Sequence, residues 1–238
     1  MEVSAGHHWV VTFWGVSCNM DTLITMWIVM AILLIVSFLA TRNLSIIPNK
    51  FQAFLENLMS FFWGMTSSMG ESGKKHTPLL ASLFLFILTA NLIGQIPWRI
   101  YHLPDGELAS PTNDINMTLA MALVVLFYYI IAGVIKKGPK YFLHYFKPMP
   151  VLAPLNMMED IIRPFSLSVR LFANILAGEV LIMVMLGLGT QMVAKLPFLG
   201  ALLPLPFMFF EIFVAVIQAL VFTLLSSAYL SLATDDGH

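Results

Sequence analysis

The sequence predicts an all-α polytopic membrane protein with five membrane crossings and one interfacial amphipathic helix. Hydrophobic residues make up 59% of the chain and charged residues only 11%, against about 25% charged residues in a soluble domain. Five apolar stretches are long enough to span the roughly 30 Å hydrocarbon core of a bilayer. The few charges include Arg170, which lies deep inside the fourth stretch. We therefore expect a single membrane domain over residues 1–238.

The N-terminal third contains a crossing and a helix of a different kind. Residues 22–41 are apolar on all sides, as expected of a first span surrounded by lipid. In residues 49–69, apolar side chains recur at intervals of three and four with polar ones between them. This pattern predicts an amphipathic helix on the membrane surface. The preceding residues 1–20 are polar and aromatic, and the pair His7-His8 fits either a metal site or a solvated tail.

The middle of the chain holds two further crossings. The second span, residues 78–96, begins at a proline, which suits a first helical turn. Asn91 and Gln95 near its end either line a wet path or bond a neighbouring helix. Residues 98–115 form a predicted loop, and residues 116–135 form the third span.

The last two helices are predicted at residues 156–188 and 206–232, with Pro- and Gly-containing segments before and between them. Both are longer than a perpendicular crossing requires, so they must tilt steeply. Because a turn joins them, we expect an antiparallel hairpin. This hairpin contains Arg170 and all the acidic residues that we regard as candidates for a site within the membrane.

The basic residues define the predicted orientation. Five crossings place nine of the twelve Lys and Arg residues on one side and two, Arg99 and Lys195, on the other. An excess of Lys and Arg marks the cytoplasmic side. The N-terminus is thus expected outside and the C-terminus in the cytoplasm. The nine are Arg42, Lys50, Lys74, Lys75, Lys136, Lys137, Lys140, Lys147 and Arg163.

Arg170 is the remaining one of the twelve Lys and Arg residues, and it is expected within the membrane. A guanidinium at that depth costs roughly 2.5–3.5 kcal/mol, so it marks a functional site by default. Ser166 and Asn174 lie one turn on either side of it, within about 40° of its face. Ala173 and Ala177 share this side, so the face is polar and slim enough for another helix to approach closely. A structural ion pair is the alternative interpretation of Arg170.

Helical geometry distributes the acidic residues on both sides of Arg170. Glu211 and Gln218 are seven residues apart and share one face of the last helix. If Gln218 lies opposite Arg170, Glu211 reaches the level of Glu179. Glu159 and Asp160 lie about 15 Å from Arg170 in the opposite, cytoplasmic direction.

Each of these positions has an alternative interpretation. Glu179 is also placed to pair with Lys195, and Glu211 and Gln218 to hydrogen-bond neighbouring helices. Glu159 and Asp160 also fit an acidic pair near a helix N-terminus, where the helix dipole favours them.

The arrangement predicts two acid-lined half-pathways separated by a fixed positive charge. A proton cannot cross Arg170 directly, because the guanidinium repels a cation. A mobile carboxylate on a partner can pass, since it pairs transiently with Arg170. At 4 Å and an effective dielectric of 20 such a pair is worth about 4 kcal/mol. Moving one charge through 200 mV involves about 4.6 kcal/mol, so the pair can form and be released.

Several motifs resemble subunit a of the F-type ATP synthase. The run from Pro164 through Arg170 and Asn174 to Glu179 closely resembles the signature of that family. The segments 217–223 and 228–230 resemble its last helix. Residues 111–118 and 136–138 are similar to the chloroplast and cyanobacterial branch. That branch usually carries a small residue at position 211 and Asp-Glu before the apolar run, whereas this chain has Glu211 and Gly178-Glu179.

The resemblance implies a proton-conducting stator subunit that faces a ring of c subunits. It assigns the essential charge to Arg170 and the neighbouring glutamine to Gln218. It places Asn174, Glu179 and Glu211 in the outer half-channel, and Glu159 and Asp160 in the cytoplasmic one. Whether the coupling ion is H⁺ or Na⁺, and which of the two outer glutamates is protonated at rest, stay open.

The resemblance also implies partners and a location. The partners would be the c-ring, b-type peripheral stalk subunits, other ATP synthase subunits and lipid, with no nucleic acid and no cofactor. The chain would have no active site of its own. A bacterial plasma membrane is the expected location, with a thylakoid membrane as the alternative.

A secondary transporter that exchanges cations through Glu179 and Glu211 is the second interpretation of the sequence, and the absence of an internal repeat counts against it. A membrane scaffold is the third, and it leaves Arg170 unexplained.

Overall fold

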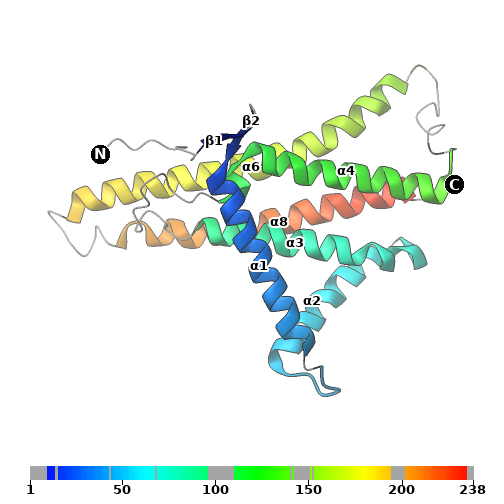
Figure 1. The fold of residues 1–238 in the computed structure, drawn as a ribbon, viewed down its shortest axis with the longest axis horizontal. Helices are drawn as coiled ribbons and strands as arrows, with labels where there is room; N and C mark the ends of the chain where they lie inside the picture. The colour runs from blue at the N-terminus through cyan, green and yellow to red at the C-terminus, as the bar shows by residue number, and fades with distance from the viewer. Residues whose placement is uncertain are drawn as a thin grey trace.

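The computed structural model describes residues 10–13, 16–42, 44–67, 69–95, 110–139, 141, 151, 153–193 and 202–234. Four helices, α3, α4, α6 and α8, run side by side and form the body of the molecule (Figure 1). Their bounds are Thr77–Gly94, Ile115–Lys137, Ala153–Val193 and Leu205–Thr234. Five helices, these four and α1 (Met20–Arg42), are long and apolar enough to cross a membrane. The all-α polytopic fold is therefore confirmed.

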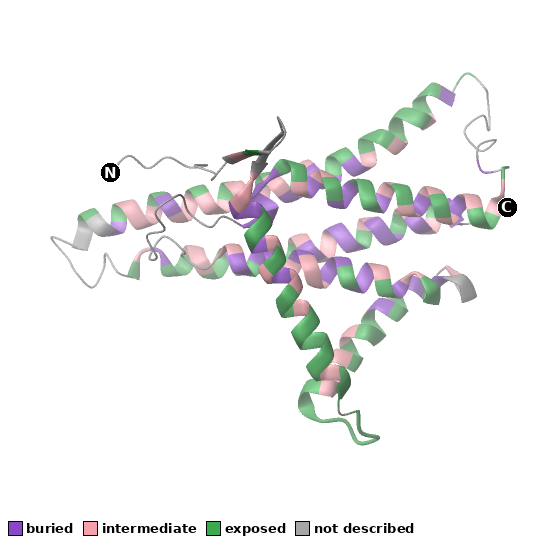
Figure 2. Ribbon diagram, in the orientation of Figure 1, coloured by how far each residue is buried: buried purple, intermediate pink, exposed green. Residues whose placement is uncertain are grey.

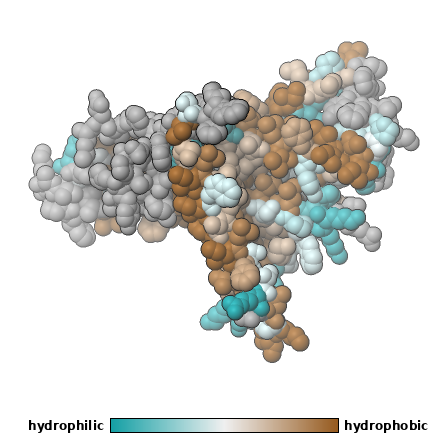
Figure 3. All heavy atoms as spheres, in the orientation of Figure 1, coloured by the Kyte–Doolittle hydropathy of each residue, from teal (hydrophilic) through white to brown (hydrophobic). Residues whose placement is uncertain are grey.

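Helix α1 stands apart from the body of the molecule. Only Asp21, Thr22, Thr25 and Val29 are buried along it. Exposed residues cover most of its length (Figure 2), and apolar side chains gather on it (Figure 3). Because every side of α1 is apolar, lipid can surround most of it. The amphipathic segment forms α2 (Lys50–Ser67), which returns towards the body of the molecule (Figure 1).

Local sequence explains where α3 and α4 begin and end. A proline occupies the first turn of α3, where no intrahelical N–H bond is lost. The side chain of Asp114 caps α4 by accepting a hydrogen bond from the backbone N–H of Asn116 at 2.8 Å. Gly138 ends α4 with a φ of +64°, a conformation that favours glycine.

Helices α6 and α8 extend beyond the ranges predicted for them. The 41 residues of α6 would span about 60 Å at 1.5 Å per residue, twice the hydrocarbon thickness. A long tilted path is therefore required if α6 stays within a bilayer. Pro164 lies inside α6 without ending it.

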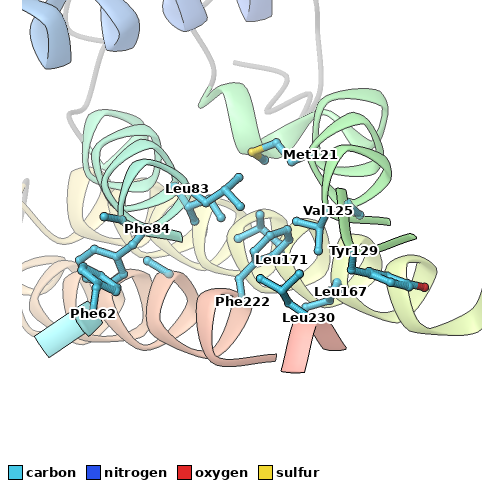
Figure 4. Close-up of a cluster of buried hydrophobic side chains, with 14 of the residues drawn as sticks. Phe62, Leu83, Phe84, Met121, Val125, Tyr129, Leu167, Leu171, Phe222 and Leu230 are labelled. Atoms are coloured by element: carbon cyan, nitrogen blue, oxygen red, sulfur yellow. The ribbon is translucent and has the colours of Figure 1, made fainter. Parts of the chain in front are cut away.

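A core of apolar side chains joins α2, α3, α4, α6 and α8 (Figure 4). The ring of Phe62 on α2 lies 5.3 Å from that of Phe84 on α3, which attaches α2 to the body of the molecule. Leu171 on α6 and Phe222 on α8 are also buried in this cluster. Burying an apolar side chain of this size contributes about 1.5–3 kcal/mol where the alternative is water.

A polar contact fixes the start of α3 against α4. His76 Nδ1 and the Tyr128 hydroxyl are 2.8 Å apart, and their rings meet edge to face. Burial, together with the charge of Lys75, lowers the pKa of His76. The ring is therefore neutral at pH 7, with one nitrogen available to accept a hydrogen bond.

Two segments that the sequence analysis treated as unstructured contain regular structure. Strands β1 (Val10–Phe13) and β2 (Val16–Asn19) pair antiparallel, with Val10 opposite Asn19. The expected tail therefore holds a β-hairpin, while His7 and His8 lie outside the described residues. Within the predicted loop, the short helix η3 (Pro111–Asn113) is buried. Both were missed because neither segment has the repeated apolar spacing that identifies a long helix.

The buried amide of Asn91 shows how η3 is held. Its oxygen accepts a hydrogen bond from Thr112 at 2.8 Å, and its nitrogen donates to the backbone oxygen of Ala215 at 3.4 Å. Asn91 thus bonds η3 and α8, as in the helix-bonding alternative of the sequence analysis. The Ser110 hydroxyl completes the attachment by donating to the Ala90 carbonyl.

Candidate functional site

Two contacts define how α6 and α8 lie against each other. The Glu211 carboxylate of α8 lies against Gly178 of α6. Further along, the Arg163 guanidinium of α6 lies 5.3 Å from the ring centre of Tyr229 on α8. Residue numbers rise along one helix as they fall along the other, so the helices are antiparallel, as the hairpin prediction requires.

Glu179 and Glu211, which we call the acid pair, meet at one end of this hairpin. Glu211 is only 7% exposed, and its Oε2 atom has no hydrogen-bond partner. Its carboxylate and that of Glu179 are close enough to repel each other when both are ionised. The structure therefore brings together the two acids that the sequence placed at the same level.

Asn113 of η3 was missed as a neighbour of the acid pair. Its side-chain nitrogen donates a hydrogen bond to Glu179 Oε2. Next to it, Asp114 accepts a hydrogen bond from the side chain of Asn19 at 2.8 Å, which joins the β-hairpin to η3. The only signal in the sequence was the family-like run at residues 111–118, which gave no indication of what Asn113 contacts.

Arg170 lies between the acid pair and the far end of α6. Its side chain is exposed, and within the described part of the chain it has no hydrogen-bond or ion-pair partner. Ser166, Ala173 and Ala177 are also exposed, and Asn174 is half-buried. The structure thus leaves uncovered the slim polar face that helical geometry predicted. Gln218 of α8 is half-buried and makes no hydrogen bond to Arg170.

Glu159 and Asp160 are bound by Arg163, which the distribution of basic residues along the sequence links only to orientation. Arg163 contacts Glu159 at 2.6 Å and Asp160 at 3.3 Å. We call these three residues the arginine cluster. A cavity of about 140 Å³ opens beside it, between α4, α6 and α8. The other polar residues that line this cavity are Tyr129, Lys137, Tyr141, Asn156 and Tyr229.

No cluster of three or more His, Cys, Asp or Glu side chains suited to a metal ion occurs among the described residues. The acid pair contributes only two such groups. The ionisable side chains of α6 and α8 instead occur as separate groups along two helices. Such a series can pass a cation from one group to the next.

Gly178→Ala is expected to impair the site, because a Cβ atom at this position would overlap the Glu211 carboxylate. The family resemblance implies proton pumping by an assembled complex, and we expect this activity to fall by up to about a hundredfold, the cost of displacing a group by about 1 Å from its working geometry. Pumping can be measured as ATP-driven acidification of membrane vesicles. Gly187→Ala on the same helix is the matched control, because an added Cβ there meets no atom within 4 Å. Equal pumping by both variants would show that the close approach is unimportant.

The fold and these side chains define an integral, multi-pass membrane protein whose two longest helices carry ionisable groups. Such groups in membrane helices are typical of ion-translocating subunits. The family described as ATP synthase A chain matches residues 23–231 of this chain. The chain therefore belongs to that family and is a proton-translocating subunit of the Fo sector of an ATP synthase, where it works with the other subunits. This confirms the family resemblance found in the sequence.

Proposed function

We propose that this subunit forms two offset aqueous half-channels separated by Arg170. The observation that carries the proposal is the position of Arg170 between the acid pair and the arginine cluster, exposed and without a hydrogen-bond or ion-pair partner among the described residues. An unpaired guanidinium in a membrane helix is costly unless a partner supplies a negative charge. A carboxylate on a ring of c subunits is the proposed partner, and it would pass Arg170 in its ionised form.

In this mechanism the acid pair serves the outer half-channel, with Asn174 and Gln218 beside the ring. Protons pass between outside water and the ring carboxylates through Glu179 and Glu211. Glu159 and Asp160 serve the cytoplasmic half-channel, with Ser166 between them and Arg170. Because the two half-channels are offset, a carboxylate must travel around the ring between protonation and release, and this drives rotation. The chain itself makes no covalent bond.

The proposal includes an orientation and further partners. The asymmetry of nine basic residues against two places the N-terminus outside and the C-terminus in the cytoplasm. A bacterial plasma membrane fits this orientation, with the thylakoid membrane as the alternative. The apolar face of α2 would lie in the cytoplasmic interface. The b-type stalk subunits are proposed as neighbours of the subunit in the intact complex.

Reconstitution separates this function from that of an autonomous transporter. The purified chain alone in liposomes should show little proton flux under an imposed potential, because its pathway is completed only by the ring. Addition of the c-ring and stalk subunits should produce flux. Fast cation exchange by the chain alone would favour the transporter and overturn the proposal.

A further inference from the structure

The two members of the acid pair have different surroundings. Glu179 accepts a hydrogen bond from Asn113. Glu211 is more than nine-tenths buried and accepts no hydrogen bond from any described residue. A donated hydrogen bond favours the ionised form of a carboxyl group, whereas burial without a donor favours the neutral form. The two acids therefore differ in how readily each holds a proton.

Asn113 is fixed in place by its neighbours. It is only 6% exposed and lies in η3, which packs against α1, α3, α4 and α6. On one side Thr112 bonds Asn91 at 2.8 Å, and on the other Asp114 caps α4. The amide therefore has little freedom to turn away. In the structure the amide nitrogen of Asn113 faces Glu179 Oε2, and the amide oxygen is buried with no hydrogen-bond partner among the described residues. The nitrogen can only donate, so in this orientation Glu179 is the acceptor.

Neighbouring carboxylates seldom ionise together, because their charges repel and one of them retains a proton. We propose that Asn113 is a positioning residue that keeps Glu179 ionised, so that the proton shared by the acid pair rests on Glu211. The inference depends on the proposed outer half-channel and specifies the resting state of its two acids. Glu211 would give its proton to a ring carboxylate and regain one from outside water by way of Glu179.

Other charges near η3 belong to the same electrostatic environment. Among the described residues, the charged groups of the elements packed against η3 include Glu179 on α6, Asp114 at the start of α4, Asp21 at the start of α1, and Arg170, which lies nine residues from Glu179 on α6. The carboxylate of Glu211 on α8 lies against Gly178, the residue that precedes Glu179 in α6. Asp114 already accepts hydrogen bonds from Asn19 and Asn116. The acidic groups among these disfavour a second negative charge on the acid pair, so one of its two members retains a proton.

The first test measures the rate of ATP synthesis by the intact complex in liposomes as a function of pH. The pH is varied in the compartment that the outer half-channel faces, which we call the outside. Asn113→Ala removes the donor, so the acid pair should hold its proton more tightly. The outside pH of half-maximal synthesis should then rise by about one unit, the size expected for one lost hydrogen bond to a charge. Thr118→Val is the matched control, because it disturbs buried packing between α4 and α6 without touching Glu179 or the bonds that hold η3. An unmoved midpoint for Asn113→Ala, or an equal shift for Thr118→Val, would overturn the inference.

A second test detects the protonated carboxyl group of the acid pair by infrared spectroscopy and needs no Asn113 variant. The infrared C=O band of a protonated carboxyl group should disappear from the complex in Glu211→Gln and persist in Glu179→Gln. The reverse pattern would contradict the assignment. If neither glutamine variant slows proton flux, the half-channel proposal itself fails. If both slow it while the Asn113→Ala midpoint stays in place, only the role of Asn113 fails.

Discussion

Arg170→Ala is expected to abolish ATP-driven proton pumping while the complex still assembles. The exposed guanidinium contributes no ion pair to the packing of the described residues, so its removal should leave the fold intact. Without the positive charge, a protonated ring carboxylate can pass directly between the half-channels in either direction, and protons leak without net rotation of the ring. The attraction lost is about 4 kcal/mol at an effective dielectric of 20 and 4 Å. This corresponds to about a thousandfold decrease in the equilibrium constant for pairing between a ring carboxylate and the side chain at position 170.

Vesicle acidification measures pumping, and co-purification of the c-ring measures assembly. Ser168→Ala is the matched control, since Ser168 lies two residues away on α6 but is buried and bonds Thr118 at 3.1 Å. The Ser168→Ala variant tests whether a disturbance of α6 that leaves Arg170 in place lowers pumping. Near-normal pumping by Arg170→Ala in assembled complexes would make the arginine structural and would defeat the half-channel mechanism.

Glu211→Gln is expected to slow pumping by about tenfold or more, with little effect on assembly. Glutamine has nearly the same shape as protonated glutamate but cannot release a proton, so it blocks transfer without opening a cavity. Losing a group that transfers protons typically costs a factor of 10²–10⁴, and water near Glu179 would offset part of that loss. The measurement is the initial rate of vesicle acidification, normalised to the amount of assembled ring.

The same chemical change outside the site provides the control for this variant. Glu56 is exposed on α2, where it accepts a hydrogen bond from Gln52 at 2.7 Å. Glu56→Gln should pump at the normal rate. Normal pumping by Glu211→Gln would remove Glu211 from the proton path, even though it adjoins Glu179.

Much of the site could be predicted from residue spacing along single helices. The exposed face around Arg170 follows from 100° per residue, and the level of Glu211 against Glu179 follows from the antiparallel hairpin. Contacts between distant segments were beyond such reasoning. The bond from Asn113 to Glu179 joins residues 66 positions apart, and a short buried helix has no periodic pattern that announces it. The number of basic residues on each side of the membrane predicts orientation, and Arg163 contributes to that number. Such a count contains no information on the side chains that Arg163 contacts.

The membrane class, the five long helices and the charged positions of α6 and α8 all follow from the amino-acid sequence alone. These properties depend on composition and helical period, which are local. Three features depend instead on how the helices pack. The Glu211 carboxylate lies against Gly178, η3 is buried, and Arg163 binds Glu159 and Asp160. Those contacts depend on the separation and rotation of packed helices, to which side chains from the whole chain contribute together.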